Sequence, residues 1–190
     1  SFHRKSSIQL FNNEFAADCF EFYPINNIKK KYDYVFLASS NSDKRDRYYS
    51  YLKKIFSKYF GVINGPGWPF SRFIIDKFDH NSIYSQSKVG INLHIPQSIE
   101  EPCELNERTY TLASAGIPQL IDNAKLISYY FPDKSLFVAT NPKEYLDLFE
   151  HIIRNPKEAY NSASLARDAI LKKHTIFHRM DNLLSNLLKH

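Results

Sequence analysis

The first third of the chain alternates a short apolar run with a segment whose apolar residues recur at helical spacing. YDYVFLASS (32–40) predicts a buried strand that ends in small residues. The following segment predicts a helix capped by Ser42 or Asp43. Its inward positions are Tyr48, Leu52, Ile55, Phe56 and Tyr59. GVIN (61–64) predicts a second strand, and Gly65 to Pro69 a turn.

The same alternation continues to the end of the chain. Further strands are expected at 72–76, at 89–95, in the apolar run that ends at Asp122, and at 135–140. A short helix is expected near 81–87, and another begins at Asn106 or Glu107. Two helices open with the same four residues, Asn-Pro-Lys-Glu (141–144 and 155–158). Asn as N-cap, Pro in the first turn and Glu in a capping box predict both starts, and a last amphipathic helix follows.

This order of elements indicates an α/β fold: a Rossmann-like parallel sheet with helices on both faces. We expect residues 1–31 to be a lead-in segment that packs on, or links to, a missing N-terminal half. Residues 32–190 form the domain, with a helical tail at its C-terminal end. Ligands of such sheets gather at the carboxyl ends of the strands, so these ends are where site residues are sought.

Composition and charge narrow the functional classes. The chain has 190 residues, of which 43% are hydrophobic, and a net charge of +5. Residues 1–60 hold 11 Lys and Arg against 6 Asp and Glu, so the excess lies in the first third. Such a surface attracts phosphates, an anionic membrane or nucleic acid, or simply keeps the protein in solution. No apolar run is long enough for a membrane span, and neither the histidines nor the two cysteines have metal-site spacing.

The end of the first strand carries residues suited to phosphate. Small hydroxyl residues precede a helix N-terminus and two cations, and backbone N–H groups there favour anions. The residues are Ser39, Ser40, Asn41, Lys44 and Arg45. The pattern lacks the glycine spacing of a dinucleotide or P-loop motif, so it is a loose one.

Two other strand ends are open to either a structural or a binding role. Gly65 and its neighbours allow a flat ligand to approach, with Trp68 available for stacking, although a plain turn with a packed Trp fits equally. Asn92 and His94 share one face of the third strand. A pair of this kind is more often satisfied structure than chemistry.

The stretch NERTYTLASAGIPQLID (106–122) places Arg108 in the first turn of a helix. A cation there opposes the helix dipole, unless an anion binds between it and the free N–H groups. Small residues at 113–115 let the helix lie close to a strand. Gly116 ends the helix, and Pro118 prevents its continuation.

Taken together, these motifs resemble the C-terminal, nucleotide-sugar-binding half of a GT-B glycosyltransferase. The type that they resemble is glycosyl transferases group 1, which includes spore-maturation-like proteins. The likeness covers roughly residues 32–188 in order. It includes YSQSKVGINLHIP (84–96) and the matched residues Arg108, Tyr110, Gly116, Pro118, Asp122, Val138, Asn155-Pro156, His174-Thr175 and His178-Arg179.

The resemblance implies a nucleotide-sugar donor and no other cofactor, with metal-independent chemistry in which a cation offsets charge on the leaving diphosphate. It implies diphosphate contacts from Ser39, Ser40, Lys44, Arg45 and Arg108. The ribose and sugar would meet Glu107, Thr109, Tyr110, Thr111, Asn92 and His94, and the base Gly65 and Trp68.

One departure from the family stands in the middle of this site. Two donor-gripping glutamates, eight residues apart in many GT-B enzymes, fall here at Cys103 and Thr111. Glu104 and Glu107 are near but out of register. A hydroxyl holds a ribose less strongly than a carboxylate does, so donor binding either uses another arrangement or is weakened.

The resemblance also implies a partner, since the catalytic base of such enzymes usually lies in the N-terminal half. We expect this chain alone not to be catalytically competent, and its last helix to need an apolar partner surface. The alternatives are a non-catalytic module that binds a nucleotide, protein or polysaccharide, and a basic protein that binds nucleic acid or a membrane surface. No nucleic-acid signature accompanies the charge, so nucleic acid is not expected. A cytoplasmic location is expected, with peripheral contact at the inner membrane face as an alternative.

Overall fold

The computed structural model describes residues 14–40, 42–68, 80–95, 105–122 and 124–188, except the side chains of residues 42–44. Its five described strands form one parallel sheet in the order β2-β1-β3-β4-β5. They are β1 (Tyr32–Leu37), β2 (Gly61–Asn64), β3 (Ser87–Asn92), β4 (Gln119–Asp122) and β5 (Phe137–Ala139). The expected Rossmann-like α/β class is confirmed. The strand expected at 72–76 lies outside the described residues.

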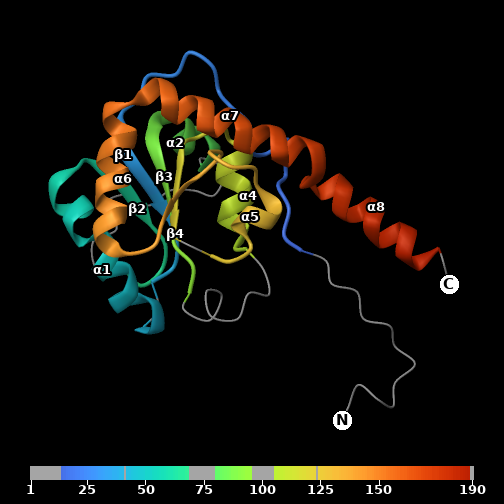
Figure 1. Ribbon diagram of the computed structural model, residues 1–190, viewed down its shortest axis with the longest axis horizontal. Helices are drawn as coiled ribbons and strands as arrows, with labels where there is room; N and C mark the ends of the chain where they lie inside the picture. The colour runs from blue at the N-terminus through green and yellow to red at the C-terminus, as the bar shows by residue number, and fades with distance from the viewer. Residues whose placement is uncertain (1–13, 41, 69–79, 96–104, 123, 189–190) are drawn as a thin grey trace, which may run out of the picture.

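Helices cover both faces of this sheet (Figure 1). On one face, α1 (Ser42–Lys58) and α6 (Pro142–Arg154) bury a continuous aromatic and aliphatic core against the strands. On the other lie α2 (His80–Gln86), α4 (Glu107–Ser114) and α5 (Ile127–Tyr130). α7 (Pro156–Lys173) contacts both α4 and α6, and α8 (Ile176–Leu187) follows it. Burial of large apolar side chains, at about 1.5–3 kcal/mol each, holds these layers together.

The small-residue stretch after Arg108 packs as expected. A Cβ on Gly90 of β3 would lie 2.7 Å from Cδ2 of Leu112, so α4 rests almost on the strand backbone. Gly116 has φ +67°, and its N–H donates to the carbonyl of Ala113 at 3.1 Å, which ends the helix. Gly90 is thus part of the same contact, because its missing side chain leaves room for Leu112.

The two Asn-Pro-Lys-Glu starts differ in the structure. Asn141 caps α6 by accepting from the N–H groups of Lys143 and Glu144. Glu144 accepts from the N–H and hydroxyl of Thr140 rather than from Asn141, which corrects the expected capping box. Asn155 caps nothing with its side chain, because that side chain donates back to the carbonyl of His151 at 2.9 Å.

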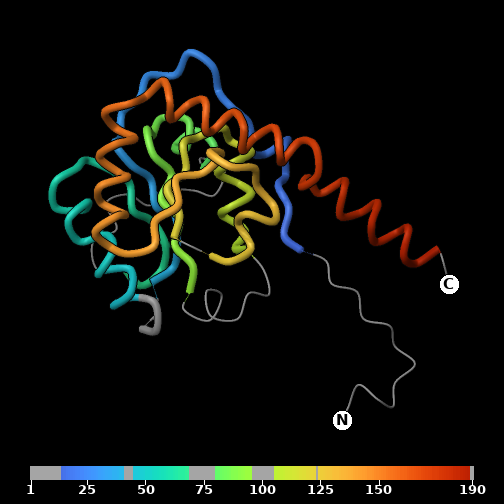
Figure 2. The backbone as a smooth tube through the Cα atoms, viewed as in Figure 1, coloured from blue at the N-terminus to red at the C-terminus, as the bar shows by residue number. Residues whose placement is uncertain are grey.

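The lead-in segment packs on this domain over residues 14–31. Figure 2 shows it passing the start of α8 and then running to the amino end of β1. Ala17 exchanges backbone hydrogen bonds with His174 and Ile176, and the hydroxyl of Ser114 donates to the carbonyl of Phe22 at 2.6 Å. Arg179 stabilises the same contact between the lead-in and the junction of α7 and α8, because it donates to the carbonyls of Glu14, Phe15 and Lys173. The described helices include none that is long and apolar enough to cross a membrane.

Candidate functional site

The strand order places a topological switch point between β1 and β3. The chain runs from β1 outward to β2, and then returns to add β3 on the other side of β1. In parallel α/β sheets ligands bind outside the carboxyl ends of the strands at such a point. Here those ends are Leu37 and Asn92.

Arg108 bridges the two strand ends at the switch point. Its Nε donates to the carbonyl of Leu37 at 2.9 Å, and Nη1 donates to Oδ1 of Asn92 at 3.2 Å. The guanidinium lies over the ring of Phe36, 5.2 Å from its centroid. These contacts hold the cation in one position beside the first turn of α4, so the expected location of Arg108 agrees with the geometry. A pre-positioned guanidinium is suited to bidentate recognition of a phosphate.

A pocket of about 280 Å³ opens beside Arg108. Glu107 and Thr111 line it from α4, and the lead-in and α2 supply the opposite wall. The lining residues are Phe22, Leu37, His80, Tyr84, Asn106, Glu107, Arg108 and Thr111. Thr111 donates to the carbonyl of Arg108 at 3.3 Å, so its hydroxyl supports the same turn. Burial raises the pKa of the Tyr84 phenol, which is also hydrogen-bonded to Thr111, so this wall stays neutral.

Asn92 lies below the pocket as the centre of a buried amide network. Its Nδ2 donates to Oγ1 of Thr109 and to Oε1 of Gln119, both at 2.9 Å. Its Oδ1 accepts from Asn106 at 2.8 Å as well as from Arg108. The expected donor contacts of Asn92 and Thr109 are therefore corrected: both side chains are fully buried and satisfied by protein groups. They support the N-terminus of α4 from beneath.

His94 has a comparable supporting role. Its ring is buried, and Nδ1 lies 2.7 Å from Oδ1 of Asp122. Since the carboxylate accepts, Nδ1 carries the proton, and Nε2 can accept from the N–H of Asn106 at 3.3 Å. Arg47 of α1 pairs with the same carboxylate and donates to the carbonyl of His94. His94 is thus not placed to touch a sugar, which differs from the expectation.

Two aromatic residues of the predicted site lie in the core. Tyr110 is fully buried against Phe131 and His174, so it cannot line a ribose site. Trp68 is 7% exposed and donates Nε1–H to the carbonyl of Ala38 at 2.7 Å. It packs on Phe36 and is not available to stack on a base.

Trp68 points into the core because of the turn that precedes it. A Cβ on Gly65 would lie 2.2 Å from the carbonyl oxygen of Ala38, and one on Gly67 would lie 2.0 Å from that of Ser40. These glycines therefore serve close approach of the chain to itself rather than to a ligand. That approach turns Trp68 inward.

The residues predicted to bind phosphate also divide into exposed and buried ones. Ser39 is exposed, whereas Ser40 is fully buried and its N–H donates to the carbonyl of Pro66 at 2.8 Å. The Ser40 side chain is therefore not exposed at this edge, and its buried hydroxyl has no hydrogen-bond partner among the described residues. Arg45 is exposed and donates to the carbonyl of Gly67 at 3.1 Å, which keeps it at this edge. The side chain of Lys44 lies outside the described residues.

Sequence reasoning missed several residues of this edge. Arg47 and Asp122 were visible as a charged cluster and a strand-end acid, but only the fold pairs them. Phe22 and Tyr84 gave no local signal, because their contact joins the lead-in to α2. Within the described parts of the chain, no three His, Cys, Asp or Glu side chains gather in a way that could hold a metal ion. Cys19 is a free thiol, and Cys103 lies outside the described residues.

Comparison with known proteins identifies the family of the chain and structures with the same fold. The family model of glycosyl transferase-like proteins matches residues 50–185. No curated protein matches the sequence significantly.

Several solved structures share the fold, among them the following three. The C-terminal domain of LpcC, a glycosyl transferase group 1 family protein from Francisella tularensis, superposes with a TM-score of 0.61 at 15% identity, over 84% of this chain and 99% of that domain. S. aureus TarM, solved as a mutant in complex with fondaparinux, α-GlcNAc-glycerol and UDP, gives 0.63 at 13% identity, over 96% of this chain and 40% of TarM. The T4 phage glucosyltransferase BGT, in complex with its UDP-glucose substrate, gives 0.56 at 15% identity, over 80% of this chain and 47% of BGT.

The coverage indicates which part of such enzymes this chain corresponds to. It spans nearly all of an isolated C-terminal domain but less than half of TarM or BGT. The family model covers more than two thirds of the chain. Together with the parallel sheet and the helices on both faces, these matches show that the chain belongs to the glycosyl transferase-like family and has the fold of the C-terminal half of a GT-B glycosyltransferase.

Proposed function

We propose that this chain binds the nucleoside diphosphate part of a nucleotide-sugar donor at the carboxyl edge of its sheet. The observation that carries the proposal is the fixed guanidinium of Arg108 between the ends of β1 and β3. A cation held there before the ligand arrives lowers the cost of ordering it, and offsets charge as a diphosphate leaves. The UDP and UDP-glucose in the TarM and BGT structures support this class of donor.

In this proposal the contacts are shared among the side chains that face the pocket. Arg108 meets the diphosphate, with Arg45 and the backbone near Ser39 at the outer side. Glu107 and Thr111 line the pocket where the ribose or sugar would lie. The exposed carboxylate of Glu107 can accept hydrogen bonds from sugar hydroxyls. We propose that this contact replaces the one made by the family's glutamate, whose position is occupied here by Thr111.

The complete reaction would transfer the sugar to a glycan, lipid or protein acceptor and needs a second half. The apolar face of α8 supports such a partner, since Phe177, Met180 and Leu184 are each about half exposed. We propose that an N-terminal GT-B half or a partner subunit covers it and supplies the catalytic base. The proposed location is the cytoplasm, with peripheral contact at the inner membrane face as the alternative.

Isothermal titration with UDP, GDP, CDP and ADP tests the donor site on this chain alone. We expect at least one nucleoside diphosphate to bind, and Arg108→Ala to weaken it by about tenfold or more, since a charge-assisted hydrogen bond is worth roughly 1.5–3 kcal/mol. Arg154→Ala is the matched control, because Arg154 is an exposed helix residue paired only with Glu150 among the described residues. If no nucleoside diphosphate binds, or if both variants weaken binding equally, the donor site is not at Arg108.

A second candidate function is a nucleotide-binding module without transfer chemistry. The hydroxyl of Thr111 is already engaged with the Arg108 carbonyl, which favours a weaker grip on the ribose. Thr111→Glu tests whether this position limits the strength of the ribose contact. Tighter binding of the nucleotide in this variant would show that the position contacts the ribose and that the native chain holds its donor weakly.

A further inference from the structure

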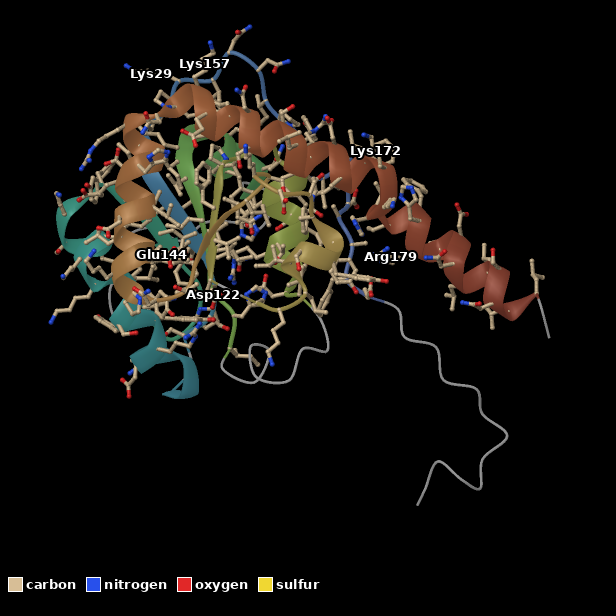
Figure 3. All side chains as sticks on the ribbon, in the orientation of Figure 1. Lys29, Asp122, Glu144, Lys157, Lys172 and Arg179 are labelled. Atoms are coloured by element: carbon tan, nitrogen blue, oxygen red, sulfur yellow. The ribbon has the colours of Figure 1, made fainter. Side chains whose placement is uncertain are left out.

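A second cavity, of about 290 Å³, lies at the opposite end of the sheet from the candidate donor site. Its walls come from lead-in residues 24–30, from Tyr84 and Ser85 of α2, from residues 115–117 after α4, and from Tyr160 of α7. Lys31 donates its N–H to the carbonyl of Gln86 beside the starts of β1 and β3, which places the cavity at the amino end of the strands. Figure 3 shows Lys29 and Lys157 at this end of the molecule and Asp122 at the other.

Lys30 brings a partly buried cation to the cavity. Its Nζ donates to the carbonyls of Ser85 and Ser87 at 2.7 and 2.9 Å, and the ring of Tyr160 lies 5.4 Å away. Among the described residues that line the cavity there is no Asp or Glu. Burial without a carboxylate lowers the pKa of Lys30 to about 8. The ammonium thus lacks the counter-ion that a desolvated cation normally has.

Two further donors near this cavity lack partners among the described residues. Ser85 lines the cavity and is 5% exposed, and its buried hydroxyl has no hydrogen-bond partner there. The buried Nε of Arg167 in α7 also has no hydrogen-bond partner among the described residues. The Cδ of Arg167 lies 3.7 Å from the point where a Cβ on Gly116 would be, and Gly116 lines the cavity. Buried donors left unsatisfied cost free energy, so an acceptor other than a described protein group, either an ordered water or a ligand atom, is expected beside each of them.

Capping of α2 explains only part of this arrangement. Lys30 reaches carbonyls at the end of α2, a favourable place for a cation. That role uses two of its three N–H groups, and it accounts neither for the unpartnered hydroxyl of Ser85 nor for the adjoining cavity. The remaining lining residues include Ile25 and Ile28 beside Asn26 and Asn27, so a short apolar body would contact one part of the lining and the charged end another.

We propose that this cavity binds a small organic anion, a monocarboxylate on a short apolar body, through the ammonium of Lys30 and the hydroxyl of Ser85. One partly desolvated ammonium matches a single negative charge better than a phosphate dianion, and Ile25 and Ile28 of the lining match a short apolar body. The cavity shares only Tyr84 with the donor pocket, so occupancy of this site does not depend on the proposed donor.

Titration of the full chain with butyrate and with benzoate, followed by NMR chemical shifts at constant ionic strength, tests the proposal. We expect saturable binding of at least one carboxylate that is about tenfold weaker in Lys30→Met, which keeps the apolar stem. Ser85→Ala should weaken it by severalfold. Lys29→Met is the matched control for bulk charge, and Arg108→Ala is the control for the donor site; both should leave carboxylate binding unchanged.

The pH dependence on the wild-type chain gives a second measurement, which does not rely on a variant that folds. The titratable and charged groups around the cavity are Lys30, Tyr84 from α2, and Tyr160 and Arg167 from α7. Burial raises the pKa of both tyrosines, so they stay neutral over the range tested. Binding should therefore be nearly constant between about pH 6 and pH 7, where the carboxylate is ionised and Lys30 is protonated, and should fall by about tenfold per pH unit well above pH 8, as Lys30 loses its proton.

Three results would overturn the proposal. The first is no saturable binding of either carboxylate by the wild-type chain. The second is equal weakening by Lys30→Met and Lys29→Met, which would show an effect of surface charge only. The third is tighter binding of inorganic phosphate than of both carboxylates. If Lys30→Met does not fold, Ser85→Ala and the pH profile decide between these outcomes.

Discussion

Asp122 is the residue whose contacts extend furthest through the candidate site. Its carboxylate accepts from the backbone N–H of His94 at 3.0 Å, from the His94 ring at 2.7 Å and from the Arg47 guanidinium. His94 in turn meets the N–H of Asn106, which caps α4. A continuous set of bonds thus runs from α1 through the end of β4 to the turn that carries Arg108.

Replacing Asp122 should test how much this set of bonds stabilises the fold. In Asp122→Asn an NH2 group replaces one carboxylate oxygen and faces the donors of Arg47 and His94. These donors thereby lose a charged, buried acceptor. Breaking a buried, hydrogen-bonded ion pair from one side costs about 3–5 kcal/mol, and we expect a loss near the lower figure because Arg47 is partly exposed. Urea unfolding measures it.

The matched control for this prediction is Asp147→Asn, which removes an exposed i, i+4 pair with Lys143. Its expected cost is much smaller than that of Asp122→Asn, because solvent screens an exposed ion pair. Equal losses in the two variants would mean that the Arg47–Asp122–His94 cluster adds nothing beyond a surface ion pair.

At the scale of elements, the junction of α7 and α8 is fixed by side chains that lie next to one another in sequence. Thr175 caps α8 and forms a capping box with His178, whose Nδ1 accepts from the Thr175 N–H. His174 is buried among the rings of Tyr110, Tyr130 and Phe131. Its Nδ1 accepts from Arg179 at 3.1 Å, and Nε2 lies 3.2 Å from the carbonyl of Tyr130. The junction therefore requires a neutral imidazole.

This requirement predicts a pH dependence of stability. Burial, reinforced by the charge of Arg179, lowers the pKa of His174 below its ordinary value of about 6.5. As pH falls through about 6.5 the unfolded chain binds a proton that the folded chain does not, so the folded state loses stability. His174→Gln removes the proton site and keeps a donor and an acceptor. The gap in unfolding free energy between wild type and variant should narrow from pH 7.5 to pH 5.5.

Urea unfolding at pH 7.5, 6.5 and 5.5 provides the measurement. The comparison of wild type with His174→Gln at each pH cancels the titration of other groups, since these are common to both chains. A gap that stays constant over this range would mean that His174 titrates alike in the folded and unfolded chains.

At the scale of the whole molecule, α8 extends away from the sheet and its layers (Figure 1). Ile176, Phe177, Met180, Leu184, Leu187 and Leu188 are between 42% and 85% exposed and form its apolar face. A contiguous apolar surface of this kind marks an interaction site. Phe20 of the lead-in joins it through an edge contact with Phe177.

The apolar face should make this chain self-associate when no partner covers it. We expect sedimentation velocity to show species larger than a monomer as the concentration rises, and Leu184→Glu with Leu187→Glu to keep the chain monomeric. Asn182→Glu with Ser185→Glu adds the same charge at exposed polar positions of α8 and should leave the association unchanged. Association that persists equally in both double variants would place the contact elsewhere.

Much of the element order followed from local chemistry. The strand at 32–37, the helix that Asn106 opens and the stop at Gly116 depend on residues within a few positions of one another. The candidate site was only partly predictable. Arg108 could be found because a cation in the first turn of a helix is unusual, and Glu107 and Thr111 follow from the same turn.

The sequence by itself indicated a parallel α/β domain with an arginine at a helix start, and its resemblance to a known family indicated the GT-B kind. Hydrophobic period, helix caps and the order of motifs depend on residues that are close in sequence, so they can be recognised without knowing the tertiary structure. Only the tertiary structure decided which polar and aromatic side chains face a ligand. Trp68 and Tyr110 turn inward, Asn92 and His94 become supports, and Lys30 meets Ser85 at the far edge. Each of these outcomes depends on segments that are distant in sequence, whose packing sets burial and hydrogen-bond partners together.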